Sequence, residues 1–365
     1  MSQLLWKDNW DRTRERFSAW WRREGPVLCV MAPREHPREG IVEPAQPSDP
    51  VQRWTDAGYR LRRGEGAMAR TYYGAEAFPC FDPEIGPGNL ATFIGSEPDY
   101  AADTVWFNPC IDEPDSFPPL AFSPANSHFQ RQLAIIEAAL ASQGERYLVG
   151  LPDLIENVDI VVSLRGMEKL LADMIDRPGF VEERVAQVNR IWFDVFERIR
   201  QRVADPWGGS TWACFHIWGK GRTAKLQCDA SAAFSPVMFH RFVVPALSEQ
   251  CRWLDNSLYH LDGLQCIVHV DELLGITDLD AIQWTAGAGR PGGGVQCWYS
   301  LYRRIMAGGK CVMATDVLPH EVIPLLDAVG PRGLFIMVEA ESEPQARALE
   351  EKVDAYRQAA RGLSS

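Results

Sequence analysis

The sequence predicts an α/β fold, a (β/α)₈ TIM barrel with an N-terminal helical and irregular extension, and three observations predict it. First, the chain has 365 residues, enough for a barrel of about 250 residues with additions. Second, apolar runs alternate with amphipathic helical segments after Asn126, as they do when crossover helices join parallel strands. Third, the chain contains eight apolar runs of strand length.

The composition changes near residue 125. Between Pro26 and Pro124 the chain is rich in proline, glycine and acidic residues and has few long periodic runs. We therefore expect residues 1–125 to form an extension that carries the first barrel strands. Residues 126–365 are expected to form the remainder of a single barrel.

Each element follows from a local pattern. Trp6 to Arg23 places aromatic residues on one broad helical face, and Gly25-Pro26 ends that helix. Ser235 followed by Pro236 is typical of a helix start, because serine caps it and proline suits its first turn. The predicted strands are 27–32, 104–107, 147–151, 211–218, 257–262, 281–284, 310–315 and 333–338. The predicted helices after residue 126 cover about 178–203, 235–254, 270–274, 298–307, 320–329 and 343–360.

The composition also excludes several classes of protein. With 46% apolar and 24% charged residues, the chain is neither disordered nor a collagen-like fibre. The formal net charge of −12 disfavours nucleic acid or an anionic membrane as the main partner. No apolar stretch approaches the ~18 residues of a spanning helix, and the first residues lack the apolar core of a signal peptide. The nine cysteines show no C-x-x-C spacing, so we expect a cytoplasmic protein with reduced thiols.

Polar residues at the predicted strand ends are the candidates for chemistry, because barrel active sites lie at the carboxyl ends of the strands. These candidates are Arg34, Asp153, His216, His260, Asp262, Gln283, Asp316 and Glu339. Asp229 ends a further short run just before the Ser235-Pro236 helix, and Gln227 lies in that run. For Asp153 and Asp229 the alternative is a carboxylate that only binds loop backbone.

The segment His260-Leu261-Asp262 is the most informative. Strand alternation puts His260 and Asp262 on one face about 6.6–7 Å apart. An imidazole and a carboxylate there can share a divalent metal or act as base and acid. A purely structural His–Asp pair remains the alternative.

Aromatic residues are the second class of candidate. The chain has thirteen tryptophans, and Trp106, Trp212, Trp218 and Trp284 fall at strand ends. Such rings, with Tyr259, can wall a pocket for a sugar, a tetrapyrrole or another organic ligand, or they can fill space between barrel and extension. The glycine-rich segment 287–294 has no phosphate-loop pattern, so we read it as a mobile loop over the mouth with Arg290 as an anion contact.

Several segments together resemble the uroporphyrinogen decarboxylase superfamily, and within it the corrinoid-linked methyltransferase-like branch. The likeness covers roughly residue 147 to the C-terminus and, more loosely, the N-terminal helix. It implies a (β/α)₈ barrel with its cleft at the strand ends. The segments that carry it are Leu164-Arg165-Gly166, Leu170-Leu171, Asp176-Arg177-Pro178, Leu226-Gln227-Cys228-Asp229, Ser235-Pro236-Val237-Met238-Phe239, Phe242-Val243-Val244-Pro245, Ser257-Leu258-Tyr259-His260-Leu261-Asp262-Gly263 and Leu279-Asp280-Ala281-Ile282-Gln283-Trp284.

The chain departs from both chemistries of that superfamily. The decarboxylases carry an N-terminal Arg-Gln-Ala-Gly-Arg motif that grips propionate groups, whereas the first strand here ends Ala32-Pro33-Arg34. The methyltransferases bind zinc with His-x-Cys and a late Cys, which activates a thiol acceptor. Here the matching positions read His260-Leu261-Asp262 and Glu339-Ala340. His260, Asp262 and Glu339 would form a harder ligand set for zinc, manganese or iron, or a metal-free site.

The resemblance implies methyl transfer to or from a corrinoid carried by a partner protein, on a small or medium organic substrate. The predicted catalytic residues are His260, Asp262, Asp229, Asp153 and Glu339. The predicted substrate-binding residues are Tyr259, Trp212, Trp218, Gln227, Gln283, Trp284, His216, Arg34 and Arg290. Two alternatives stay open, since fold-level likeness does not fix the reaction. One is a carboxylate-based lyase, decarboxylase or glycoside-active enzyme with an aromatic-walled pocket, and the other is a binding barrel without turnover.

Overall fold

The computed structural model describes residues 4–362, with side chains as far as Ala359, and shows a mixed α/β architecture. The strands are β1 (Val27–Pro33), β2 (Thr71–Ala75), β3 (Cys80–Phe81), β4 (Glu97–Tyr100), β5 (Val105–Asn108), β6 (Leu148–Val149), β7 (Gly209–Trp212), β8 (Ile217–Lys220), β9 (Thr223–Gln227), β10 (Asn256–Asp262), β11 (Ala281–Thr285), β12 (Cys311–Ala314) and β13 (Leu334–Glu339).

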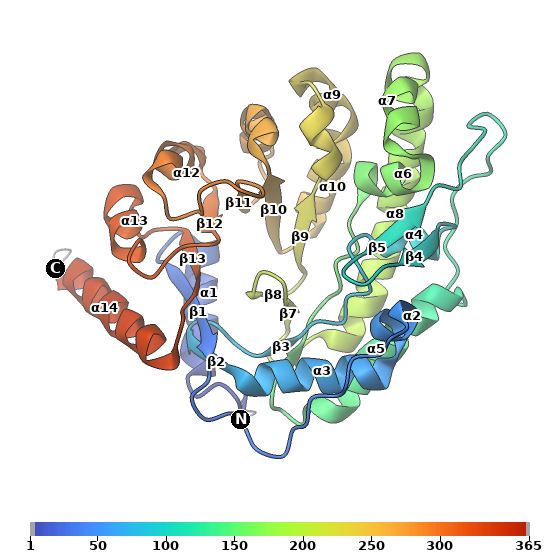
Figure 1. Cartoon of the computed structure of the whole chain (residues 1–365). Helices are drawn as coiled ribbons and strands as arrows, with labels where there is room; N and C mark the ends of the chain where they lie inside the picture. The colour runs from blue at the N-terminus through green and yellow to red at the C-terminus, as the bar shows by residue number, and fades with distance from the viewer. Residues whose placement is uncertain (1–3, 363–365) are drawn as a thin grey trace.

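The helices surround these strands (Figure 1). They are α1 (Trp10–Trp21), α2 (Pro50–Thr55), α3 (Ala57–Arg70), α4 (Leu90–Phe93), α5 (Ser127–Gln143), α6 (Asn157–Arg165), α7 (Met167–Asp176), α8 (Pro178–Val203), α9 (Pro236–Phe242), α10 (Val244–Trp253), α11 (Val270–Gly275), α12 (Tyr299–Ala307), α13 (Val322–Val329) and α14 (Glu343–Gly362). Three short 3₁₀ helices are η1 (Asp229–Ala233), η2 (Leu264–His269) and η3 (Gln296–Trp298).

A seven-stranded sheet forms the centre, in the order β2-β1-β13-β12-β11-β10-β9. Its strands run parallel except for β2, which pairs antiparallel with β1 at one edge. From β9 to β13 each strand follows its neighbour through a helical connection, which is what parallel pairing requires. Most residues of these strands are buried, as expected where helices cover a parallel sheet.

The remaining strands form short pairs. β3 pairs parallel with β6, and an isolated parallel bridge joins Leu151, just after β6, to Trp212 of β7. β4 with β5 and β7 with β8 form antiparallel hairpins. Among residues 4–362 these pairings do not join the central sheet into a closed ring.

Helix α1 packs against the central sheet through its aromatic face. The Phe17 and Trp20 rings lie edge-on to Phe335 of β13, with centroids 5.7 and 5.4 Å away. The Trp20 indole N–H donates to the Gly333 carbonyl at 3.0 Å, and the Trp21 indole N–H donates to the Trp218 carbonyl at 2.9 Å. Within the described part of the chain, no helix has the length and apolar character needed to cross a bilayer.

The carboxyl-terminal half of the predicted order is confirmed. Strands β10 to β13 and helix α8 lie where the sequence predicts them. Three predictions are wrong. The 104–107 run belongs to the β4–β5 hairpin outside the central sheet, and 211–218 is a hairpin, β7 and β8, with a turn at Ala213–His216. The predicted 235–254 helix is two helices, α9 and α10, that meet at Val243 just before Pro245, where proline removes a backbone donor.

Candidate active site

A polar row crosses three neighbouring strands at the carboxyl edge of the sheet. In the strand register His260 of β10 lies opposite Gln227 of β9 on one side and Gln283 of β11 on the other. Residues opposite each other in parallel strands share a face, so the three side chains lie on the same side of the sheet. Lys225 precedes Gln227 by two residues and therefore shares this face.

Three potential ligands converge at the end of this row. One ligand atom each of Asp229, His260 and Asp262 lies within 4.8 Å of the others. The Asp262 Oδ1 atom is buried and has no hydrogen-bond partner among the described residues. Because buried polar atoms are nearly always bonded, this oxygen indicates a partner that the protein itself does not supply. We call Asp229, His260 and Asp262 the ligand cluster.

The hydrogen bonds around His260 fix its tautomer. His260 Nδ1 bonds to Gln283 Oε1, while Gln283 Nε2 donates to the hydroxyls of Thr285 at 2.8 Å and Thr315 at 3.1 Å. The Thr315 hydroxyl donates its own hydrogen to the Trp284 carbonyl, so it accepts from Gln283. Gln283 therefore presents its carbonyl to His260, Nδ1 carries the proton, and the Nε2 lone pair is left free.

Burial and charge favour the neutral form of this imidazole. Burial lowers the pKa of His260, and the positive charge of Lys225 lowers it further, against the opposite effect of Gln283 and Asp262. A neutral imidazole can serve as a metal ligand or a base. Asp229 is exposed, yet partial desolvation by the surrounding protein raises its pKa to about 6; the like charges of Asp262 and Asp153 add to the rise, and Lys225 opposes it.

Two buried acids at the start of α6 hold the end of β9 in place. Asp159 accepts from the backbone N–H groups of Asp229 at 2.8 Å and Ala230 at 3.0 Å, and Glu156 accepts from the backbone N–H of Gln227. Burial raises the pKa of Asp159 to about 6, and the nearby Asp229 raises it too. These acids position Asp229, and the sequence analysis did not identify them.

Lys225 is the other residue that the sequence analysis missed. Its side chain is 2% exposed, and its ammonium lies 2.6 Å from Asp153 Oδ2 and also donates to Gln227 Oε1. Burial lowers the pKa of Lys225, but Asp153 and Glu156 raise it by more, so the ammonium stays charged. The available signal was alternation: Lys225 and Gln227 are two polar residues spaced by two within an otherwise apolar run.

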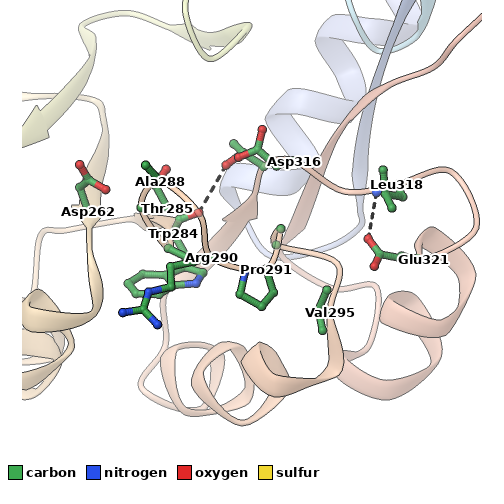
Figure 2. Close-up of a pocket in the computed structure, with 15 residues that line it drawn as sticks. Asp262, Trp284, Thr285, Ala288, Arg290, Pro291, Val295, Asp316, Leu318 and Glu321 are labelled. Atoms are coloured by element: carbon green, nitrogen blue, oxygen red, sulfur yellow. Dashed lines mark hydrogen bonds between the residues drawn. The ribbon is translucent and has the colours of Figure 1, made fainter.

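Two cavities lie at this edge of the sheet. The first, of about 530 Å³, touches the ligand cluster through Asp262, and Figure 2 shows it; we call it the loop cavity. Its polar and aromatic lining comprises Asp262, Trp284, Thr285, Arg290, Thr315, Asp316 and Glu321. The second, of about 560 Å³, lies beneath α3; we call it the α3 cavity. Its polar lining includes Arg60, Arg63, Tyr73, Asp82, Glu84, Cys214, His216 and Glu339.

The structure brings most of the predicted chemistry together and removes one residue from it. His260, Asp262, Asp229, Asp153, Gln227 and Gln283 gather around Lys225. Glu339 does not join them, because β13 is three strands from β10 and Glu339 lines the α3 cavity together with His216. The predicted ligand set His260, Asp262 and Glu339 is therefore replaced by the ligand cluster.

Several predicted substrate contacts are placed elsewhere. Tyr259 is buried on the opposite face of β10, with its ring edge-on to Phe239 of α9. Arg34 lines neither cavity, and its Nε donates to the His36 carbonyl at 3.2 Å. Neither residue is positioned to contact a ligand in these cavities.

The aromatic wall reduces to one tryptophan. Trp212 and Trp218 are core residues whose indole N–H groups donate to the Thr223 carbonyl at 3.0 Å and to Asp205 at 2.6 Å. Trp106 is 65% exposed on the β4–β5 hairpin. Trp284 lines the loop cavity, as does Arg290.

One imidazole nitrogen and two carboxylates on a recessed edge can hold a divalent cation or exchange a proton with a bound substrate. The buried Lys225 pairs with Asp153 and offsets part of the negative charge at this edge. No protein-family model matches the chain, and no curated protein matches it either.

Proposed function

We propose that the chain is a (β/α)₈-barrel enzyme that holds a divalent cation at Asp229, His260 and Asp262 and transfers a methyl group to or from a small organic substrate. The observation that carries the proposal is the ligand cluster. Its three ligand atoms lie within 4.8 Å of one another, and Asp262 Oδ1 is buried without a protein partner.

The position of the site supports the interpretation of this strand arrangement as a barrel. The parallel strands β9 to β13 and β1 form one arc, and the β3–β6 pair with its bridge to β7 supplies a second. We propose that the two arcs belong to one barrel. The ligand cluster then lies at the carboxyl ends of barrel strands, where such enzymes carry out their chemistry.

The donor set favours a borderline or hard cation. One nitrogen and two carboxylate oxygens suit zinc in a catalytic site, and they also suit manganese or iron. Three protein ligands leave positions open for a substrate. A cation held there supplies Lewis acidity, which lowers the pKa of a thiol or hydroxyl on the substrate.

The protein's own groups then have defined roles. Gln283 holds His260 through Nδ1 and leaves its Nε2 lone pair free, and Asp159 holds Asp229 through the backbone at the start of η1. Asp229 would supply a ligand oxygen, and in the metal-free site its raised pKa of about 6 suits it to exchange a proton near neutral pH. Methyl transfer itself, and a corrinoid donor on a partner protein, come from the family resemblance, and no residue of this chain is assigned to the corrinoid.

The test is elemental analysis of purified wild type, His260→Ala and Asp262→Asn after loading with zinc or manganese and removal of excess. We expect about one equivalent in wild type and little in either variant. His320→Ala is the matched control, because His320 is exposed and outside the cluster. Demethylation of methylcobalamin by a panel of thiols, followed by absorbance, checks the reaction before and after chelation.

A second function is favoured by one observation, the raised pKa of Asp229 beside Asp262. A carboxyl group with a raised pKa beside a second carboxylate is an arrangement that general acid and base catalysis can use without metal. Full activity in metal-free protein would reject the cation and leave this carboxylate-based reading.

A further inference from the structure

The loop cavity adjoins the ligand cluster but offers different groups. One wall is the glycine-rich segment 286–294, and the other is the carboxyl end of β11 and β12. Figure 2 shows Asp262 and Arg290 on one side of the cavity and Asp316 with Glu321 on the other. A volume of about 530 Å³ is suited to a small organic ligand.

Two donors at this cavity lack a protein acceptor. The Trp284 ring is 1% exposed, yet its indole N–H has no hydrogen-bond partner among the described residues. The Arg290 side chain, although exposed, forms no ion pair or hydrogen bond with any residue of the range 4–362. Since a buried N–H is rarely left unbonded, the Trp284 N–H indicates an acceptor supplied by a ligand, and Arg290 is a cation beside it that no described acid pairs with.

The loop base that carries Arg290 is held firmly. The indole N–H of Trp298 donates to the Pro291 carbonyl at 3.2 Å, and the Tyr302 hydroxyl donates to the Gly293 carbonyl at 2.8 Å. The Gly293 N–H in turn donates to the Thr315 carbonyl at 2.9 Å. A side chain at Gly293 would collide with that same carbonyl oxygen, so glycine is required for the approach. Arg290 therefore extends from a fixed base.

The acids that line the cavity form no ion pair with Arg290 in the described part of the chain. Glu321 accepts from the Leu318 backbone N–H at 2.9 Å, and Asp316 lies across the cavity from Arg290 (Figure 2). The Arg290 guanidinium is thus the positive charge available to a ligand on the side of the cavity where Asp262 lies. Arginine binds carboxylate and phosphate oxygens through two parallel N–H groups, which gives both affinity and orientation.

We propose that the loop cavity binds the oxyanionic end of the substrate, a carboxylate or a phosphate, through Arg290 and the Trp284 N–H. This assignment rests on the proposed function, since the other end of the same molecule would reach the ligand cluster. The substrate is then a small molecule with an acceptor group at one end and an oxyanion at the other.

The experiment is a titration followed by the indole signals in ¹H–¹⁵N NMR spectra, with the Trp284 signal assigned from its loss in Trp284→Phe. The probes are acetate, inorganic phosphate and the neutral analogue acetamide. Acetate or phosphate should shift the Trp284 signal, and acetamide should not. The anion that binds with the lower dissociation constant identifies the type of oxyanion. Arg290→Gln should raise the dissociation constant roughly tenfold or more, as loss of a charge-assisted pair does.

Arg332→Gln is the matched control, because Arg332 is exposed and precedes β13, at the opposite end of the strands from the cavity. Equal affinity in wild type and Arg290→Gln, or equal binding of acetamide and acetate, would overturn the proposal. Parallel titrations of the wild-type protein with zinc and with the anions separate the two proposals. Anion binding without metal binding leaves the subsite and rejects the cation, whereas zinc binding without anion binding rejects the subsite alone.

Discussion

The Lys225 ammonium lies 2.6 Å from the Asp153 carboxylate, and this ion pair is the centre of the charged interior at the sheet edge. Lys225 is fully enclosed, and Glu156 is buried beside it. Burial raises the pKa of Glu156 well above its usual range, and Lys225 opposes that rise. The positive charge of Lys225 therefore stabilises several acidic side chains that lie close together in this buried region.

Replacing Lys225 with methionine should destabilise the protein by about 3–5 kcal/mol, because a buried carboxylate would lose its partner. The measurement is urea unfolding at pH 7. Lys352→Met, an exposed lysine on α14, is the control and should change stability by less than about 0.5 kcal/mol. Adding Asp153→Asn to Lys225→Met should recover part of the loss, and an unchanged or larger loss would show that Asp153 does not need this charge.

Gln283 should control zinc affinity without touching the metal. Gln283→Leu removes the acceptor that holds His260 Nδ1–H, so we expect zinc binding to weaken about 10–100-fold. Gln283→Glu keeps an acceptor at that position and should retain binding, and Gln296→Leu, at an exposed glutamine, should have no effect. Competition titration with a chelating dye measures all three; equal affinity in the leucine variant would mean that Gln283 does not orient the imidazole.

Asp262→Asn should remove metal and turnover while leaving the fold intact. The replacement is nearly isosteric, and Asp262 Oδ1 has no hydrogen bond within the described residues to lose. We expect the free energy of unfolding to change by less than about 1 kcal/mol. Thermal unfolding of the metal-free proteins is the check. A loss above about 3 kcal/mol, the scale of a broken buried network, would assign Asp262 to structure instead.

The sequence predicts the carboxyl-terminal half of the fold because each strand there is a continuous apolar run. β10 to β13 have four to seven residues each, most of them buried. In the amino-terminal half β1 and β6 lie where strands are predicted, but β3 escapes prediction because its two residues are too few for a periodic signal. The β7–β8 turn contains no glycine or proline, and His216 supplies its left-handed backbone at φ 46°, so the hairpin resembles one strand.

Strand alternation made part of the site predictable from the sequence. The distance between strands across the sheet and the packing of distant segments were not predictable in this way. Alternation places His260 and Asp262 on one face, as the structure shows. Alternation does not give the distance across the sheet. The sequence therefore groups Glu339 with His260 and Asp262, although three strand spacings of about 4.8 Å separate β13 from β10. Glu156 and Asp159 carry no local signal, because only the folded chain brings α6 to the end of β9.

Glu84, which lines the α3 cavity, should make stability depend on pH. Burial raises the pKa of Glu84 to about 8, and the charges of Asp82 and Asp153 add to the rise. In the unfolded chain a glutamate titrates near the usual value of about 4.3. Between these pH values the folded state holds a proton that the unfolded state has lost, so this group's contribution to stability falls as the pH rises.

Glu84→Gln removes that cost, since glutamine stays neutral. The variant should match wild type near pH 4.5 and become more stable than wild type as the pH rises, by about 1–3 kcal/mol at pH 8. Urea unfolding at pH 4.5, 6, 7 and 8 measures the difference, with Glu351→Gln, an exposed glutamate of α14, as the control. A stability difference that is constant with pH, or that has the opposite sign, would show that Glu84 is ionised in the folded protein at neutral pH. In that case its carboxylate has a cationic partner in the α3 cavity, and Arg60 and Arg63 are the residues to test next.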